Sequence, residues 1–125
     1  MYVVTFNGQV TDEQFRAYLS ALSALMGRGG WRVLVYDARL AAPAPASQRR
    51  MQAEWMKLND AGVRRSTAGI AFVIPSAVVR GVLTAIFWLQ PLACPHLVTE
   101  SFEEAFRWAR GKLASTPRAE PAPPR

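Results

Sequence analysis

The clearest feature of the hydrophobic pattern is an almost unbroken apolar run from Gly69 to Leu92. Its first part, Ala68 to Ile74, is rich in β-branched and aromatic residues without polar alternation, which is typical of a strand covered on both faces in a parallel sheet. Pro75-Ser76 then ends the strand, and the pattern predicts a helix from Ala77 to Leu89. We therefore expect this strand and helix to lie at the centre of the fold.

The N-terminal part of the chain predicts a strand, a turn and a helix. Tyr2 to Phe6 has the composition of a strand, and Asn7-Gly8 is a dipeptide favoured in two-residue hairpin turns, so that Gln9-Val10 is expected to pair back. Thr11-Asp12-Glu13-Gln14 has the sequence of a capping box at a helix start, and glycines at 27–30 predict the end of that helix. Its buried stripe is predicted at Phe15, Tyr18, Leu19, Leu22, Leu25 and Met26.

A second strand is predicted from Trp31 to Asp37, and a second helix after a proline-containing loop at 38–46. Ser47 is the predicted N-cap of this helix, which extends to the neighbourhood of Arg64. Its inner face is predicted at Met51, Trp55 and Leu58.

The last two elements are a short strand from Pro95 to Thr99, expected at an edge of the sheet, and a helix that starts with a second capping box, Ser101 to Glu104. Strand and helix thus alternate four times, which predicts an α/β fold with a four- to five-stranded, mostly parallel sheet and four helices in one domain of residues 1–113. Residues 114–125 contain four prolines and no apolar periodicity, so we expect a disordered tail.

Composition adds expectations about compartment and partners. The chain has 125 residues, half of them hydrophobic, and a single cysteine, Cys94, which excludes an internal disulfide and fits a cytoplasmic location. Residues 1–5 lack the pattern of a secretory signal, and Pro75 and Arg80 interrupt the longest apolar run, so no membrane-spanning segment is expected.

The net charge of +6 raises the question of an anionic partner, either nucleic acid or an acidic lipid surface. Several arginines lie in predicted turns or in the tail, and only Arg49-Arg50 and Arg64-Arg65, at the two ends of the second helix, form a local concentration. A solvated surface explains this distribution better, so nucleic acid is not an expected partner.

A family resemblance rests on the order of the elements and on two motifs, Val10-Thr11-x-x-Gln14 before the first helix and Val33-Leu34-Val35-Tyr36-Asp37 before the second. Over residues 2–113 the chain resembles the STAS and SpoIIAA-like group. The resemblance implies a bacterial-type regulatory module similar to anti-sigma-factor antagonists, which bind a protein and are switched by phosphorylation at the start of the second helix. Ser47 stands at that place, but the Ser-Gly pair of the family motif is missing. Capping is the simpler reason for a serine there.

Catalytic and metal sites are not predicted. His96, the single histidine, begins its strand, whereas Asp37, Ser76 and Ser101 follow the ends of theirs, so a catalytic triad cannot assemble across a parallel sheet. Cys94 and His96 share a face of an extended segment, but a buried structural cysteine is the favoured interpretation. One His and one Cys are too few for a metal site, and no cofactor is expected.

The helix from Ala77 to Leu89 has more apolar surface than a four-stranded sheet can cover. A sheet-facing stripe is predicted at Val79, Val82, Leu83 and Ile86, which leaves Val78, Phe87, Trp88 and Leu89. Either the chain's own loops cover this surplus surface, or the surface is an interface. We expect protein contact, with self-association included, as the leading function. The predicted contact residues are Arg80, Thr84, Phe87, Trp88, Arg49 and Arg50. The alternative is a carrier or sensor that binds an apolar small molecule or lipid in a pocket near Asp37 and Ser76.

Overall fold

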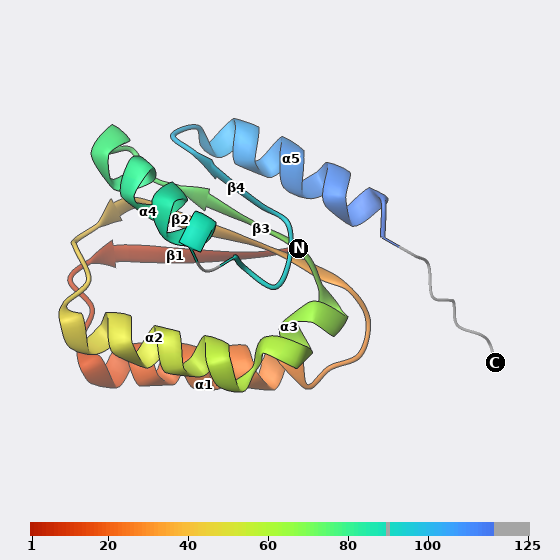
Figure 1. The fold of residues 1–125 in the computed structure, drawn as a ribbon, viewed down its shortest axis with the longest axis horizontal. Coiled ribbons are helices and arrows are strands. Elements are labelled where there is room, and N and C mark those ends of the chain that lie inside the picture. The colour runs from red at the N-terminus through yellow and green to blue at the C-terminus, as the bar shows by residue number, and fades with distance from the viewer. Residues whose placement is uncertain (90, 117–125) are drawn as a thin grey trace.

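The computed structural model describes residues 1–89 and 91–116, and strands and helices alternate along them (Figure 1). The elements are β1 (Tyr2–Gly8), α1 (Asp12–Met26), β2 (Arg32–Ala41), α2 (Ala46–Leu58), α3 (Asp60–Ser66), β3 (Thr67–Val73), α4 (Ala77–Leu89), β4 (His96–Thr99) and α5 (Phe102–Ala114). The strands pair in the order β1-β2-β3-β4, and every pair is parallel. The predicted α/β class is confirmed, with four strands in the described sheet.

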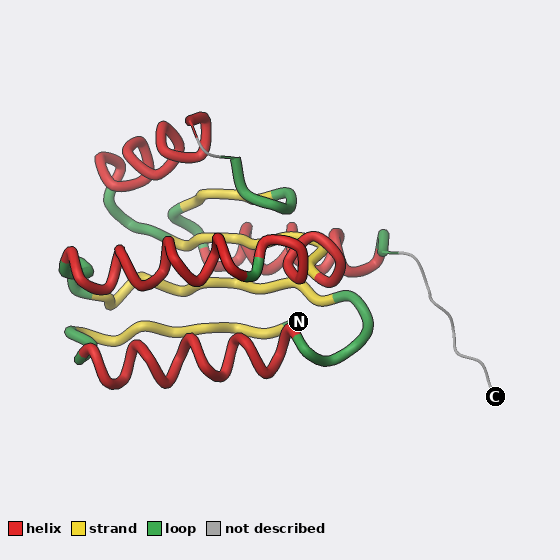
Figure 2. The backbone as a smooth tube through the Cα atoms, turned by 60° about the horizontal axis from the view of Figure 1, so that its bottom comes forward, coloured by secondary structure: helices red, strands yellow, loops and turns green. Residues whose placement is uncertain are grey.

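Helices cover both faces of this sheet, and α5 has one face largely to itself (Figure 2). Because side chains alternate along a strand, neighbouring residues of β2 and β3 enter different cores. On the α5 face the core consists of Val33, Val35, Ala71, Val73, Ala105 and Ala109, all fully buried. This layer is densely packed around two small alanines of α5, which let the helix approach the sheet.

Gly69 of β3 shows how close that approach is. A Cβ atom at this position would lie 2.8 Å from the ring of Trp108 in α5, so only glycine leaves room for the indole. The close contact fixes α5 against the middle of the sheet.

The opposite face carries α1, α2, α3 and α4, but its core is smaller. Leu34 and Ile70 of the sheet are buried together with Leu22 and Cys94. The last helix on this face, α4, buries only Phe87 and touches chiefly the edge strand β4. The looser cover on this face leaves space between sheet and helices.

The predicted hairpin after β1 is wrong. Asn7 and Gly8 belong to β1 itself and pair with Leu40 and Ala41 of the parallel strand β2, after a register shift that begins at Thr5. Gly8 has a positive φ of 66° and ends the strand. Its left-handed backbone turns the chain toward α1 instead of back along β1.

The second helix differs from the prediction at both its start and its middle. Pro45, with φ −68° and ψ 162°, is the N-cap, and helix α2 begins at Ala46, so Ser47 lies inside the first turn and is not the cap. Asn59 interrupts the helix with φ −112° and ψ 14°, and its side chain donates a hydrogen bond to the Trp55 carbonyl at 2.8 Å. Asn competes for backbone acceptors in this way, which explains why the described residues form five helices and not four.

Both N-terminal caps at Thr11 and Ser101 form, the first completely. The Gln14 amide donates to Thr11 Oγ1 at 3.1 Å, and the Thr11 amide donates to Gln14 Oε1 at 3.0 Å. At the second cap the Glu104 amide donates to Ser101 Oγ at 3.1 Å, but the Glu104 carboxylate accepts from the Thr99 hydroxyl instead of closing the box.

The C-terminal boundary lies one residue later than predicted, because α5 includes Ala114. Most of the predicted disordered tail, 117–125, lies outside the described residues, as does Gln90. None of the described helices combines the length and the apolar character that a membrane crossing requires.

Candidate functional site

A cavity of about 780 Å³ lies between the sheet and the helices on the less densely packed face. Strands β1, β2 and β3 form its floor, α1, α2 and α3 form its walls, and α4 with the loop 91–93 flanks its remaining side. It is partly open to solvent, and its exposed lining is mostly apolar. A volume of this size is within the range of small-molecule sites, roughly 300–1,000 Å³.

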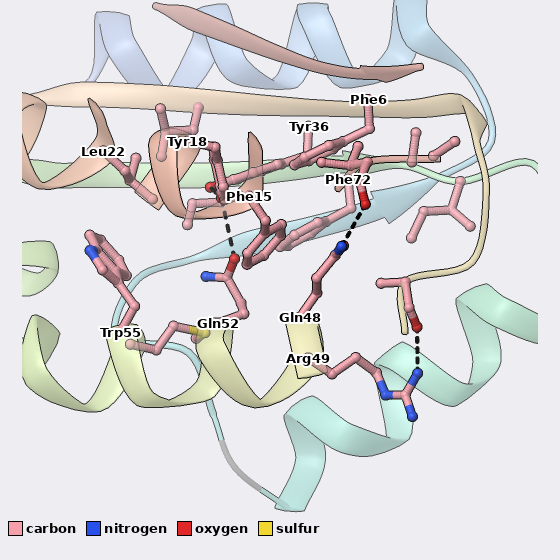
Figure 3. Close-up of a pocket in the computed structure, with 18 of the residues that line it drawn as sticks. Phe6, Phe15, Tyr18, Leu22, Tyr36, Gln48, Arg49, Gln52, Trp55 and Phe72 are labelled. Carbon is pink, nitrogen blue, oxygen red and sulfur yellow. Dashed lines mark hydrogen bonds between the residues drawn. The ribbon is translucent and has the colours of Figure 1, made fainter. Parts of the chain in front are cut away.

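The floor of the cavity is a row of aromatic rings from three neighbouring strands, Phe6, Tyr36 and Phe72 (Figure 3). The rings of Phe6 and Tyr36 are 6.3 Å apart and nearly parallel, and those of Tyr36 and Phe72 are 5.5 Å apart and inclined by 13°. Tyr36 and Phe72 are aligned partners of neighbouring strands, whereas Phe6 lies at the register shift of β1, two residues beyond Val4, the partner of Tyr36. All three side chains project to the same face. It offers an apolar, polarisable surface to a ligand.

The walls come from the inner stripes of α1 and α2. Phe15, Tyr18 and Leu22 of α1, which belong to the predicted buried stripe, line the cavity, and Leu22 also belongs to the core on this face. Trp55 of α2 also lines it and donates its indole N–H to Ser23 of α1 at 2.8 Å. That hydrogen bond ties the two walls together.

Helix α4 leaves the cavity open on its side because only part of the helix approaches the sheet. Phe87 packs against Phe72 and His96, with ring centroids 5.5 and 4.6 Å away. Val79 lines the cavity but stays half exposed. The stripe of Val79, Val82, Leu83 and Ile86 was predicted to face the sheet. That prediction is wrong for Val79, Val82 and Ile86, which are exposed.

Hydroxyl and amide groups inside the cavity form a small uncharged network. Tyr18 and Tyr36 share a hydrogen bond of 2.6 Å between their hydroxyl oxygens, and the Tyr18 hydroxyl also donates to Gln52 Oε1 at 3.4 Å (Figure 3). Burial raises the pKa of both tyrosines above the usual value. Both phenols are therefore neutral at physiological pH.

Gln48 fixes the end of the cavity near the carboxyl ends of the strands. Its side chain is only 3% exposed and donates to the Val10 carbonyl at 2.6 Å and to Asp12 Oδ1 at 3.1 Å. These bonds join the starts of α2 and α1. The sequence contained one indication of these wall residues, because Gln48, Gln52 and Met56 recur at a spacing of four and so share one side of α2.

The two predicted pocket residues separate. Ser76 lines the cavity, whereas Asp37 does not, because alternation along β2 turns its side chain toward α5. There Asp37 accepts hydrogen bonds from Arg39 Nε at 2.8 Å and Nη2 at 2.7 Å, and the Arg39 guanidinium lies over the Phe102 ring. Hydrogen bonds from Arg39 hold the pKa of the Asp37 carboxyl below its usual value.

The predicted contact residues of α4 also separate. Arg80 donates to the Ile74 and Pro75 carbonyls at 2.8 and 2.9 Å, so its guanidinium is largely engaged within the molecule. Phe87 faces the sheet, whereas Trp88 is 84% exposed and Thr84 is exposed. On α2, Arg49 and Arg50 are both exposed, and of these two only Arg49 lines the cavity.

The predicted phosphorylation site, Ser47, is hydrogen-bonded to a carboxylate. Its hydroxyl donates to Asp12 Oδ1 at 3.2 Å, and Arg49 and Arg50 follow in the same turn. A phosphate at Ser47 would be repelled by Asp12 and attracted by the two arginines. Phosphorylation of Ser47 stays a prediction.

Cys94 and His96 do not form an activated pair. Burial raises the pKa of the Cys94 thiol to about 11, and the His96 ring packs edge-on against Phe87. The thiol is therefore protonated at neutral pH and is a poor nucleophile. Within the described residues no group of three or more His, Cys, Asp or Glu side chains could hold a metal ion.

Comparison of the chain with protein-family models, with curated proteins and with solved structures finds no match. The class that the structure defines is an α/β domain with a four-stranded, all-parallel sheet in its described part. The resemblance to the STAS and SpoIIAA-like group stays a prediction.

Proposed function

We propose that this protein binds an apolar small molecule, as a carrier or sensor, in the cavity between the sheet and α1, α2, α3 and α4. The observation that supports this function is the cavity itself, about 780 Å³ in volume with an aromatic floor of Phe6, Tyr36 and Phe72. Apolar cavities with a few convergent polar groups are the usual form of ligand sites. Burying an apolar ligand there removes about 25 cal/mol of unfavourable hydration for each Å² of apolar surface.

A neutral fluorescent probe tests this proposal. N-phenyl-1-naphthylamine, whose emission rises in apolar surroundings, should bind wild-type protein with a stoichiometry of one. Met56→Trp enlarges a side chain that lines the cavity, and we expect it to weaken probe binding by roughly tenfold or more, because the added ring fills ligand space.

Leu58→Trp is the matched control, because Leu58 lies on the same helix, is 85% exposed and does not line the cavity. It should leave the affinity unchanged. If circular dichroism shows both proteins folded and Met56→Trp binds the probe as tightly as wild-type protein, the probe does not bind in the cavity and the proposal is wrong.

A second candidate function is regulatory protein contact in the cytoplasm, as in anti-sigma-factor antagonists, and one observation favours it. Helix α4 exposes an outer face, consisting of Val78, Val82, Ile86, Trp88 and Leu89. Exposed apolar patches on a helix are typical of contact surfaces. We propose self-association through this outer face as its simplest form, since one helix face can pair with its own copy about a two-fold axis.

A further inference from the structure

The charged residues around the cavity differ in whether an ion pair within the protein balances their charge. Three charged residues border the cavity, Arg39, Arg49 and Asp60. The Arg39 guanidinium itself lies on the α5 face, over an aromatic ring of α5. Arg39 is paired with Asp37, and Asp60 accepts a hydrogen bond from Arg64 Nε at 2.8 Å. Two of the three charges are thus balanced within the protein.

The positive charge of Arg49 is not balanced by an ion pair within the described residues. Arg49 Nη1 donates to the Ala44 carbonyl at 2.5 Å. The Asp12 carboxylate accepts hydrogen bonds from Ser47 and Gln48, which precede Arg49 in α2, and Asp12 does not line the cavity. The remaining Arg49 donors are available to an anion.

The position of Arg49 gives the cavity a polar end and an apolar end. Arg49 lies in the first turn of α2 and contacts Ala44, in the lining segment 42–45 that follows the carboxyl end of β2. Leu22 and Trp55 line the opposite end (Figure 3). The start of α2 adds the positive end of a helix dipole to the Arg49 end.

We propose that the ligand is an amphipathic anion, an apolar body that carries one carboxylate, with the carboxylate held by Arg49 and the body over the rings of Phe6, Tyr36 and Phe72. This inference rests on the proposed function and adds the class of ligand to it. A guanidinium with free donors is the protein group best suited to a carboxylate. The neutral hydroxyl network of Tyr18 and Tyr36 adds no negative charge that would repel such a ligand.

Competition between two ligands that differ only in the head group tests the inference. Dodecanoate and dodecan-1-ol are each titrated against protein loaded with N-phenyl-1-naphthylamine, below the concentrations at which they aggregate. In wild-type protein we expect dodecanoate to bind at least about tenfold more tightly than dodecan-1-ol, as a charge-assisted hydrogen bond implies.

Arg49→Gln should abolish this preference by lowering the affinity for dodecanoate far more than that for dodecan-1-ol, whereas Arg49→Lys should retain part of the preference. Arg50→Gln is the matched control, because Arg50 carries the same charge on the same helix and does not line the cavity. It should preserve the preference.

Equal binding of dodecanoate and dodecan-1-ol to wild-type protein would overturn the inference and leave the proposed function intact. The same loss in Arg50→Gln as in Arg49→Gln would also overturn it, because general surface charge would then explain the effect. If the neutral probe and both ligands fail to bind wild-type protein, the proposed function fails as well.

Discussion

Asp37 shows how one residue of β2 serves the fold and not the cavity. Its carboxylate accepts hydrogen bonds from the side chain and the backbone N–H of Arg39, on the α5 side of the sheet. The sequence predicted that the strand ends at Asp37, but β2 continues to Ala41, and Asp37 pairs with both neighbouring strands inside the sheet. The face to which its side chain points depends on this pairing. Its role is to anchor Arg39 over Phe102 and so to close the α5 core.

Asp37→Asn tests that role. Because Arg39 lowers the pKa of Asp37 in the folded state, the carboxylate contributes stability above its unfolded-state pKa, about 3.9, and loses this contribution as the pH falls through the lower folded-state pKa. We therefore expect Asp37→Asn to lower the free energy of unfolding at pH 7, measured by urea denaturation. The difference from wild type should disappear in strongly acidic solution.

A difference that is the same at pH 7 and pH 2 would contradict this explanation, because the effect would then be independent of the charge on Asp37. Arg39→Gln provides the matched variant. It removes the partner and should reproduce the pH dependence of Asp37→Asn.

At the scale of elements, α5 and α4 contrast most. Their packing differs because α5 presents Ala105 and Ala109 to the centre of the sheet, whereas α4 meets mainly the edge strand β4. Sequence periodicity predicted the buried stripe of α1 correctly, because one side of that helix is polar. It predicted the wrong side of α4, since apolar residues surround most of that axis and Arg80 is held by the carbonyls of Ile74 and Pro75.

A single charged substitution tests whether the outer face of α4 mediates self-association. If it mediates self-association, Val82→Glu should convert a dimer to a monomer in sedimentation equilibrium, because an unpaired carboxylate would be buried in the contact. Leu58→Glu is the control, because it adds the same charge at an apolar position of α2 that is 85% exposed and lies outside this face. A wild-type protein that is monomeric at every accessible concentration would contradict self-association through this face.

At the scale of the molecule, the sequence predicted the α/β class, the parallel sheet, the edge position of β4 and the helix starts at Thr11 and Ser101. It predicted a pocket only as the alternative function, near Asp37 and Ser76, and of these two residues Ser76 lines the cavity and Asp37 does not. It did not predict that the inner side chains of α1 and α2 form the walls of that pocket.

Tyr18 and Tyr36 looked like ordinary members of a buried stripe and a buried strand, and the space beside these two rings arises only when α2 packs on α1 and α4 lies at the sheet edge. A cavity is a property of several elements together, so no local pattern encodes it.

The tryptophan side chains provide an internal test of where a ligand binds. The structure describes four of them, Trp31, Trp55, Trp88 and Trp108, and of these only Trp55 lines the cavity. Trp88 lies on the outer face of α4, and Trp108 packs on Gly69 at the opposite face of the sheet. Their indole N–H groups therefore report on separate surfaces of one protein.

The most direct measurement is a nitrogen–proton NMR titration of labelled protein with N-phenyl-1-naphthylamine, with the indole resonances assigned by single Trp→Phe variants. The resonance of Trp55, which donates to Ser23 at 2.8 Å, should shift and saturate at one equivalent, while those of Trp31, Trp88 and Trp108 stay in place. A shift of Trp88 with none at Trp55 would contradict binding in the cavity, as would four unchanged resonances at saturating probe.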